Sequence, residues 1–186
     1  KNLDKKPYIL VNDTLKALHD LSRFVRSRSK AKFIAITGSN GKTTVKEMIA
    51  HILSDHKICY TKGNFNNHIG VPLTLLSMKQ DEDYVIIEVG ANNLGEIRPL
   101  ANIINPDVAA VTNIGYAHIE GFKNLDNTAQ EKYSIFDYVK KDGFSVINDQ
   151  KEYRKFIKKG NKVFFGYKND FYYKFKRKLK NFFYKT

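Results

Sequence analysis

The residues with the most evident chemistry form a short glycine-bounded loop, Thr37-Gly38-Ser39-Asn40-Gly41-Lys42-Thr43-Thr44. Glycines let backbone amides approach phosphate oxygens closely and adopt positive φ angles. Lys42 supplies a mobile cation for β- and γ-phosphates, and the hydroxyl of Thr43 can ligate Mg²⁺. We therefore predict a nucleotide-phosphate site, which is formed by Gly38, Ser39, Asn40, Gly41, Lys42, Thr43 and Thr44.

The loop departs from the general phosphate-loop pattern, because only two residues separate Gly38 from Gly41. The alternative is a strand-to-helix turn that holds no ligand. Its flanks favour a site. Residues 33–37 form an apolar run that predicts a buried strand, and a helix with an apolar face follows. The apolar residues of that helix are Val45, Met48, Ile49, Ile52 and Leu53. A helix that begins at such a loop directs free N–H groups and a partial positive charge at a bound anion.

Strands and helices alternate along the rest of the chain. Apolar runs predict strands at 84–89, 108–112 and 144–148, and helices are predicted at 96–104 and 128–139. Thr128 and Glu131 have the spacing of a capping box that would open the last helix. An earlier helix, capped by Asn12 or Asp13, is expected to bury Leu15, Leu18, Leu21 and Val25. This alternation predicts an α/β fold with a parallel, doubly wound sheet.

The formal net charge of +13 would suit a nucleic-acid-binding protein, but the charge is concentrated at one end. Residues 151–186 hold 13 of the 32 Lys and Arg and only 2 of the 19 Asp and Glu, together with 12 of the 24 Phe and Tyr. The rest of the chain is close to neutral. Such a charge run is more often solvated than a nucleic-acid site, so we expect no nucleic-acid partner. No element is predicted for this tail.

Cysteine content and hydropathy point to the cytoplasm. Cys59 is the only cysteine and cannot form an internal disulfide, which fits a reducing compartment. No run of 18 or more apolar residues occurs, so no transmembrane helix is expected. We expect a cytoplasmic monomer without membrane contact.

Six ordered stretches resemble one enzyme family. After the loop at 37–44, the sequence contains G-N-F-N-N-H-I-G-V-P at 63–72, I-E-V-G-A-N at 87–92 followed by G-E-I, T-N-I-G at 112–115, A-H-I-E-G-F at 117–122 and K-Y-S-I-F at 132–136. Together these are similar to the Mur ligases and their folylpolyglutamate synthetase relatives. The second and third stretches look most like the members that use D-alanyl-D-alanine.

The resemblance implies ATP-dependent amide synthesis in the making of peptidoglycan precursors, with ATP and Mg²⁺ as cofactors. ATP would phosphorylate the terminal carboxylate of UDP-N-acetylmuramoyl-tripeptide. The amine of D-alanyl-D-alanine would then attack the acyl phosphate and release phosphate. One alternative is a sister Mur ligase or a folylpolyglutamate-type synthetase. Another is a non-catalytic module that binds nucleotides or polyanions.

Two Mg²⁺ sites are implied by the resemblance. Glu88 would bind the first ion together with Thr43; from the residues alone, a turn hydrogen bond of Glu88 is an equal alternative. His118 and Lys132 would bind the second, although a lone histidine is usually structural and a helical lysine is usually solvated. In the family the matching lysine is carbamylated, which requires a neutral amine and hence a lowered pKa. Relatives often have Glu where Ser134 stands here.

Three asparagines, Asn64, Asn66 and Asn67, are candidates for substrate contact, since amides donate hydrogen bonds without adding charge. An Asx-turn scaffold competes strongly with that role. Asn113 is a candidate for nucleotide contact and is equally ambiguous, as is Glu120.

The chain is expected to have three parts. Residues 1–30 would be the end of an N-terminal domain and its linker. Residues 31–150 would be a partial ATP-binding central domain, and residues 151–186 a basic aromatic tail that is disordered or aberrant in origin. The later segment of the central domain and the C-terminal domain that the resemblance implies are not found. We therefore expect a truncated product whose isolated chain could be inactive.

Overall fold

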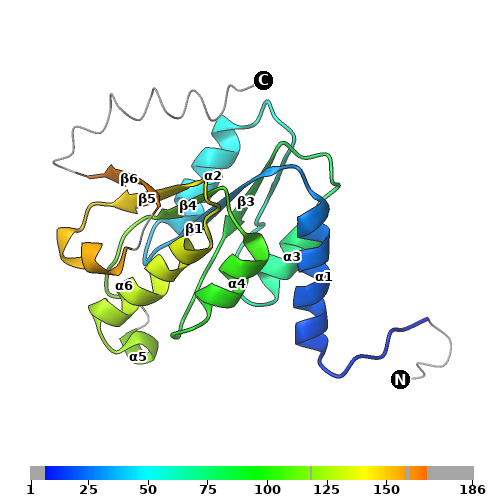
Figure 1. Ribbon diagram of the computed structural model, residues 1–186, viewed down its shortest axis with the longest axis horizontal. Helices are drawn as coiled ribbons and strands as arrows, with labels where there is room; N and C mark the ends of the chain where they lie inside the picture. The colour runs from blue at the N-terminus through cyan, green and yellow to red at the C-terminus, as the bar shows by residue number, and fades with distance from the viewer. Residues whose placement is uncertain (1–6, 118, 158–159, 167–186) are drawn as a thin grey trace.

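One six-stranded parallel sheet organises the protein (Figure 1). The computed structural model describes residues 7–117, 119–157 and 160–166. The strands lie in the order β2-β3-β1-β4-β5-β6, so β1 occupies the middle. Their bounds are β1 Lys32–Thr37, β2 Ile58–Tyr60, β3 Tyr84–Glu88, β4 Val108–Val111, β5 Phe144–Asn148 and β6 Asn161–Phe165. This confirms the predicted fold class.

Helices cover both faces of the sheet (Figure 1). The helices are α1 Thr14–Arg28, α2 Lys42–Ile52, α3 Gly70–Leu76, α4 Ile97–Ile104, α5 Ile119–Phe122 and α6 Leu125–Tyr133, with 3₁₀ turns η2 Ser134–Tyr138 and η3 Lys151–Phe156. Successive residues of β1 face opposite sides: Ile34 and Ile36 pack with α2, whereas Phe33 and Ala35 pack with α3, α4 and α6. A sheet buried on both faces explains the unbroken apolar strand sequences.

No helix among the described residues is long and apolar enough to cross a membrane.

The helix α1 is capped as predicted, but it buries a different face. The Asp13 carboxylate accepts from the amide of Lys16 at 2.9 Å. Ser22 and Arg26 are buried, whereas Leu21, predicted to be inside, is 53% exposed. Arg26 donates to the carbonyl oxygens of Ile104 (2.5 Å) and Asn105 (2.9 Å) at the end of α4, which offsets the cost of its burial. Within the part expected at 1–30, the helix α1 therefore packs against the sheet domain.

The apolar face predicted for α2 is confirmed in part, because Val45, Ile49 and Leu53 pack in the core. Met48 and Ile52 are 59% and 74% exposed, although their spacing placed them on the apolar face. Lys46 and Ala50 are buried instead. Lys46 can be buried because its ammonium donates to the backbone carbonyl oxygen of Thr61, which lets its aliphatic stem pack in the interior.

The cap predicted for the helix at 128–139 is wrong. The helix α6 begins earlier and is capped by Asn124, whose side chain accepts from the amide of Asn127. Glu131 does not cap its own helix; its buried carboxylate accepts from the amides of Gly95 and Ile97, each at 2.7 Å. These two amides at the start of α4 have no partner within the helix, and this explains why a buried carboxylate is tolerated there.

The sheet continues past the boundary expected at residue 150. Residues 151–156 form η3, and β6 pairs along its whole length with β5. Val163 and Tyr153 are buried in the core. The prediction that no element follows residue 150 is therefore wrong for residues 151–156 and 161–165, because a short strand with one buried side chain gives little periodic signal. The remainder of the tail lies outside the described residues.

Candidate nucleotide-phosphate site

The predicted loop lies where the strand order reverses. The loop follows β1, Glu88 ends β3, and Thr112 follows β4, and these three strands are neighbours in the sheet. Their carboxyl ends therefore meet at one edge, which is the position where open α/β sheets bind ligands.

The glycines of the loop have the geometry that the sequence predicts. Gly41 has φ +79° and ψ +2° and is the N-cap of α2, so the first amides of that helix open onto the loop. Gly38 has φ +147°, and a Cβ atom there would overlap the side chain of Thr112. Gly41 is therefore required by its backbone conformation. Gly38 is required by its conformation and also because a side chain would not fit beside Thr112.

Lys42 is held over the loop. Its ammonium donates to the carbonyl oxygen of Gly38 at 2.9 Å and to that of Ser39 at 3.4 Å. Burial lowers its pKa from the ordinary lysine value, and the nearby Glu88 carboxylate partly opposes this shift. A half-buried cation that is held by neutral backbone carbonyls can turn to a phosphate at small cost.

Glu88 is buried and orients two neighbours. One carboxylate oxygen accepts from the Thr43 hydroxyl at 2.9 Å, and the other accepts from the side-chain amide of Asn66 at 2.8 Å. Asn66 is itself fixed, since its carbonyl oxygen accepts from the amide of Gly90 at 2.8 Å. The structure thus brings Thr43, Glu88 and Asn66 together beside the loop.

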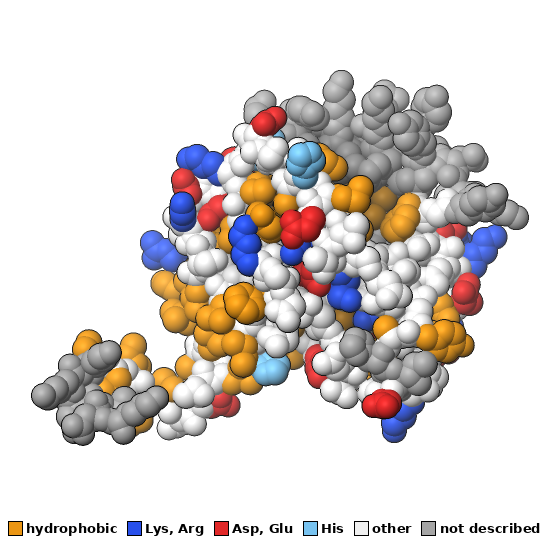
Figure 2. Space-filling view, turned by 180° about the vertical axis from the view of Figure 1, so that it is seen from behind, with side chains coloured by type: hydrophobic (Ala, Val, Ile, Leu, Met, Phe, Trp, Pro, Cys, Tyr) orange, Lys and Arg blue, Asp and Glu red, His pale blue; other side chains and the backbone are white. Residues whose placement is uncertain are grey.

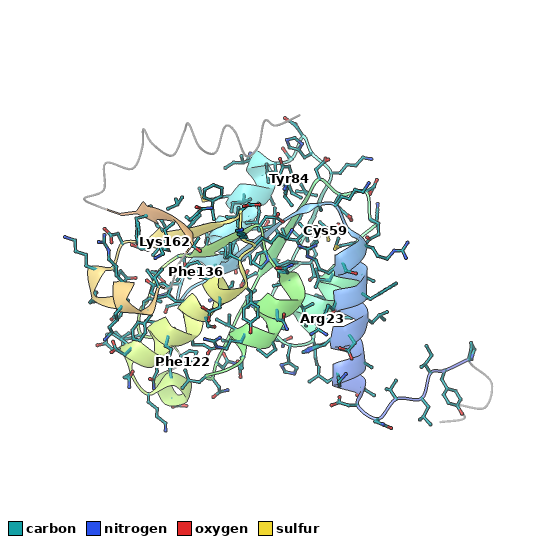
Figure 3. All side chains as sticks on the ribbon, viewed as in Figure 1. Arg23, Cys59, Tyr84, Phe122, Phe136 and Lys162 are labelled. Carbon is teal, nitrogen blue, oxygen red and sulfur yellow. The ribbon has the colours of Figure 1, made fainter. Side chains whose placement is uncertain are left out.

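Lys132 belongs to the same neighbourhood. It lies in α6 and is almost completely buried. Burial, reinforced by the positive charge of Lys42, lowers the pKa of Lys132 to about 8. Its ammonium lies 5.3 Å from the centre of the Phe122 ring, which Figure 3 labels near α5. The residue is therefore not the solvated helical lysine that its type alone suggests.

The other asparagines differ in their surroundings. The side-chain oxygen of Asn67 accepts from the amides of Ile69 and Gly70, so it forms the turn before α3 that was the competing interpretation. Asn64 is exposed and offers its backbone oxygen to the amide of Asn66. Their roles in substrate binding stay predictions.

Asn113 supports the phosphate loop from the next strand. Its side-chain oxygen accepts from the amide of Asn40 at 2.9 Å, and its backbone oxygen accepts from the amide of Ser39 at 3.0 Å. Ser39 in turn exchanges hydrogen bonds with the backbone of Gly115. Residues 112–115 therefore brace the loop.

Sequence reasoning missed Gln150, which holds this brace in place. Its side-chain amide accepts from the amide of Ile114 at 2.7 Å and donates to the carbonyl oxygen of Ile114 at 2.8 Å. Asn148 adds a bond to the carbonyl oxygen of Thr112. No sequence signal identifies a glutamine that pairs both backbone groups of a residue 36 positions away.

Replacing Gln150 with leucine is expected to lower the free energy of unfolding by about 1–2 kcal/mol, because two part-buried backbone groups of Ile114 lose their partners. Gln150→Glu should also be destabilising, since a carboxylate oxygen would face the carbonyl oxygen of Ile114 to which the amide now donates. Urea unfolding measures both. Gln130→Leu, on the exposed side of α6, is the control; equal stability of the Gln130 and Gln150 variants would contradict the bracing role.

The donor atoms here suit a hard divalent cation. The Thr43 hydroxyl and the Glu88 carboxylate are oxygen ligands, and Mg²⁺ usually takes one or two such groups and completes its shell with phosphates and water. Within the described residues no group of three or more His, Cys, Asp and Glu side chains gathers as a metal centre. His118, predicted to bind a second ion, lies outside the described residues.

The sequence matches the family model of the Mur ligase middle domain over residues 36–184. The chain belongs to the Mur ligase family. The match extends well past residue 150, so the family resemblance is not limited to the region that the motifs covered.

Among Mur ligases, similar relatives include UDP-N-acetylmuramoyl-tripeptide–D-alanyl-D-alanine ligases. That of Buchnera aphidicola subsp. Acyrthosiphon pisum is 43% identical over 95% of this chain and 38% of its own length. That of Escherichia coli K12 is 44% identical over 76% of this chain and 32% of its own. The chain thus spans between about a third and two fifths of these relatives.

A solved structure has the same fold. The MurF ligase of Thermotoga maritima, solved in complex with ADP, superposes with a TM-score of 0.83 at 30% identity, over 91% of this chain and 40% of its own. The whole parallel sheet with its helices is therefore that of a Mur ligase central domain.

Proposed function

We propose that this Mur ligase domain binds ATP with Mg²⁺ at the loop 37–44. The observation that carries the proposal is the hydrogen bond between Thr43 and the buried Glu88 beside the ammonium of Lys42. Backbone amides of the loop and of α2 would receive the phosphate oxygens, and Lys42 would turn from its carbonyls to them. Thr43 and Glu88 would hold the ion, which when bound neutralises phosphate charge.

The whole protein that contains this domain would be an ADP-forming amide ligase of peptidoglycan precursor synthesis. It would join D-alanyl-D-alanine to UDP-N-acetylmuramoyl-tripeptide through an acyl phosphate. The support is the identity of more than 40% with ligases of that name. We further propose that residues 36–184, which match the family model, belong to the nucleotide-binding domain. The proposed site of the reaction is the cytoplasm, in keeping with the single Cys59.

Lys132 would be carbamylated in this function. A primary amine reacts with CO₂ only when it is neutral, and a pKa of about 8 gives a far larger neutral fraction at pH 7–8 than an ordinary lysine has. The product is an anion that could join His118 at a second Mg²⁺. With ¹³C-bicarbonate, we expect a carbamate resonance that is missing in Lys132→Arg; the same spectrum from both chains would rule this out.

Calorimetry tests nucleotide binding directly. The chain is titrated with ATP in the presence of Mg²⁺ and, separately, in the presence of a chelator. Saturable binding that is tighter with Mg²⁺ is expected. A folded chain that binds ATP in neither condition would contradict the proposal.

The acceptor is tested with the intact protein. ADP formation that depends on UDP-N-acetylmuramoyl-tripeptide should require D-alanyl-D-alanine and should not occur with single amino acids. A preference for a single amino acid would indicate a sister ligase instead.

A further inference from the structure

Thr61 is a junction between three elements that surround the phosphate site. It directly follows β2 and is fully buried. Its amide donates to the carbonyl oxygen of Ile86 at 3.0 Å, and its hydroxyl accepts from the amide of Glu88 at 3.0 Å. Its carbonyl oxygen accepts from the ammonium of Lys46 at 2.8 Å. One residue thus ties β2 to the end of β3 and both to α2.

Lys46 is a fully buried lysine, which is costly unless its charge is paired. Its ammonium also pairs with the carboxylate of Glu47 at 2.9 Å, and the centre of the Tyr60 ring lies 5.9 Å away. The Glu47 carboxylate lies on the exposed side of the ammonium and balances its charge. The hydrogen bond to the buried carbonyl oxygen of Thr61 fixes the position of the Lys46 ammonium.

The chain of contacts leads to both proposed metal ligands. Thr43 and Lys46 are three residues apart in α2, so they lie on neighbouring turns of one side. Glu88 is held at its amide by Thr61 and at its carboxylate by Thr43. Lys46 therefore connects the helix that carries one ligand, through Thr61, to the strand end that carries the other.

We propose that Lys46 and Thr61 are positioning residues that set the separation between the Thr43 hydroxyl and the Glu88 carboxylate for a divalent cation on the nucleotide. This inference rests on the proposed function. Neither residue contacts the phosphates; each acts through the ligands that it holds. Their effect therefore falls on the part of nucleotide affinity that depends on the metal.

The first measurement is the ratio of ATP affinities with Mg²⁺ and with a chelator. Lys46→Met keeps the stem and removes the charge, and Thr61→Val removes the hydroxyl that accepts from Glu88. In both variants we expect the enhancement by Mg²⁺ to fall on the order of tenfold, while metal-free affinity stays near wild type.

Two variants serve as controls. Thr61→Ser keeps the hydroxyl and should restore the ratio. Glu47→Gln keeps an oxygen that can accept from the Lys46 ammonium and should leave the ratio unchanged.

The second measurement needs no nucleotide. Amide hydrogen exchange of Glu88, followed by NMR, should speed up on the order of tenfold in Thr61→Val and in Lys46→Met, whereas exchange at Ala35 in the neighbouring strand stays slow. A merely structural role would change both positions together and would weaken metal-free binding as well.

The outcomes separate the two claims. If the wild-type chain binds no nucleotide, the proposed function fails and the exchange of Glu88 alone decides the positioning role. If Lys46→Met does not fold, Thr61→Val and Thr61→Ser decide it. Folded variants that keep wild-type enhancement by Mg²⁺ and wild-type exchange at Glu88 would overturn the proposal.

Discussion

Replacing Lys42 with alanine is expected to weaken the binding of Mg²⁺·ATP on the order of 100-fold, as measured by calorimetry on this chain. The ammonium stands over the loop, where it donates to the carbonyl oxygens of Gly38 and Ser39. In the complex it would exchange these bonds for charge-assisted bonds to phosphate oxygens, which are stronger. The loss should appear with ADP as well as with ATP.

Stability separates this effect from unfolding. Burial lowers the pKa of Lys42, so the protein gains little by keeping the charge there, and Lys42→Ala should unfold near the wild-type urea concentration. Lys57→Ala is the control. Lys57 directly precedes the edge strand β2 and pairs with Asp81 on the surface. Wild-type affinity in Lys42→Ala would mean that the loop does not bind phosphate.

Replacing Lys132 with methionine is expected to stabilise the metal-free chain by about 3 kcal/mol at pH 7, measured by urea unfolding in CO₂-free buffer with a chelator. The folded protein lowers the pKa of Lys132 from 10.5 to about 8. Below pH 8 the lysine is charged in both states and the full cost of burying the charge is present. Methionine fills similar space without that cost.

The sign of the pH dependence follows from the same shift. Between about pH 8 and pH 10.5 the unfolded chain binds more protons at Lys132 than the folded chain does, so wild-type stability rises with pH through this window. The advantage of Lys132→Met should therefore shrink as the pH is raised to 10. The exposed Lys79→Met should change stability by less than about 0.5 kcal/mol at either pH. A destabilised Lys132→Met variant would contradict the buried-charge interpretation.

Alternating apolar strands and helices were enough to predict the doubly wound sheet, because a fully buried parallel strand is unbroken in its apolar sequence. The loop and Thr43 were predicted for a similar reason, whereas the ligand role of Glu88 was predicted from the family resemblance. Strand ends followed by glycine mark the edge where such sheets place ligands, and the structure brings these residues together there.

Apolar spacing predicted only part of the buried faces of α1 and α2. In α1 and α2 the buried positions include Arg26 and Lys46, whose long stems pack while their charged ends reach backbone carbonyls. A hydropathy pattern treats both residues as polar and therefore predicts that both are exposed. Gln150 and Thr61 were missed for a related reason, since only the fold brings their hydrogen-bond partners near them.

The strand β6, in the charged tail, was missed for a different reason. Its composition gave no period, yet β6 adds to the sheet through five residues in register with β5. On the face shown in Figure 2, the described acidic and basic side chains are interspersed and form no continuous basic surface.

The central claim is that Thr43 and Glu88 hold a divalent cation on a nucleotide at this edge of the sheet. Mn²⁺ can replace Mg²⁺ in such oxygen sites and broadens the NMR signals of nearby nuclei. With ¹⁵N-labelled chain, ADP and a trace of Mn²⁺, we predict broadened amide signals at 38–44 and 88–90, and sharp signals at Lys32 and Tyr84, which begin β1 and β3 at the opposite edge. Broadening that is absent from the loop, or centred on the opposite edge, would contradict the account.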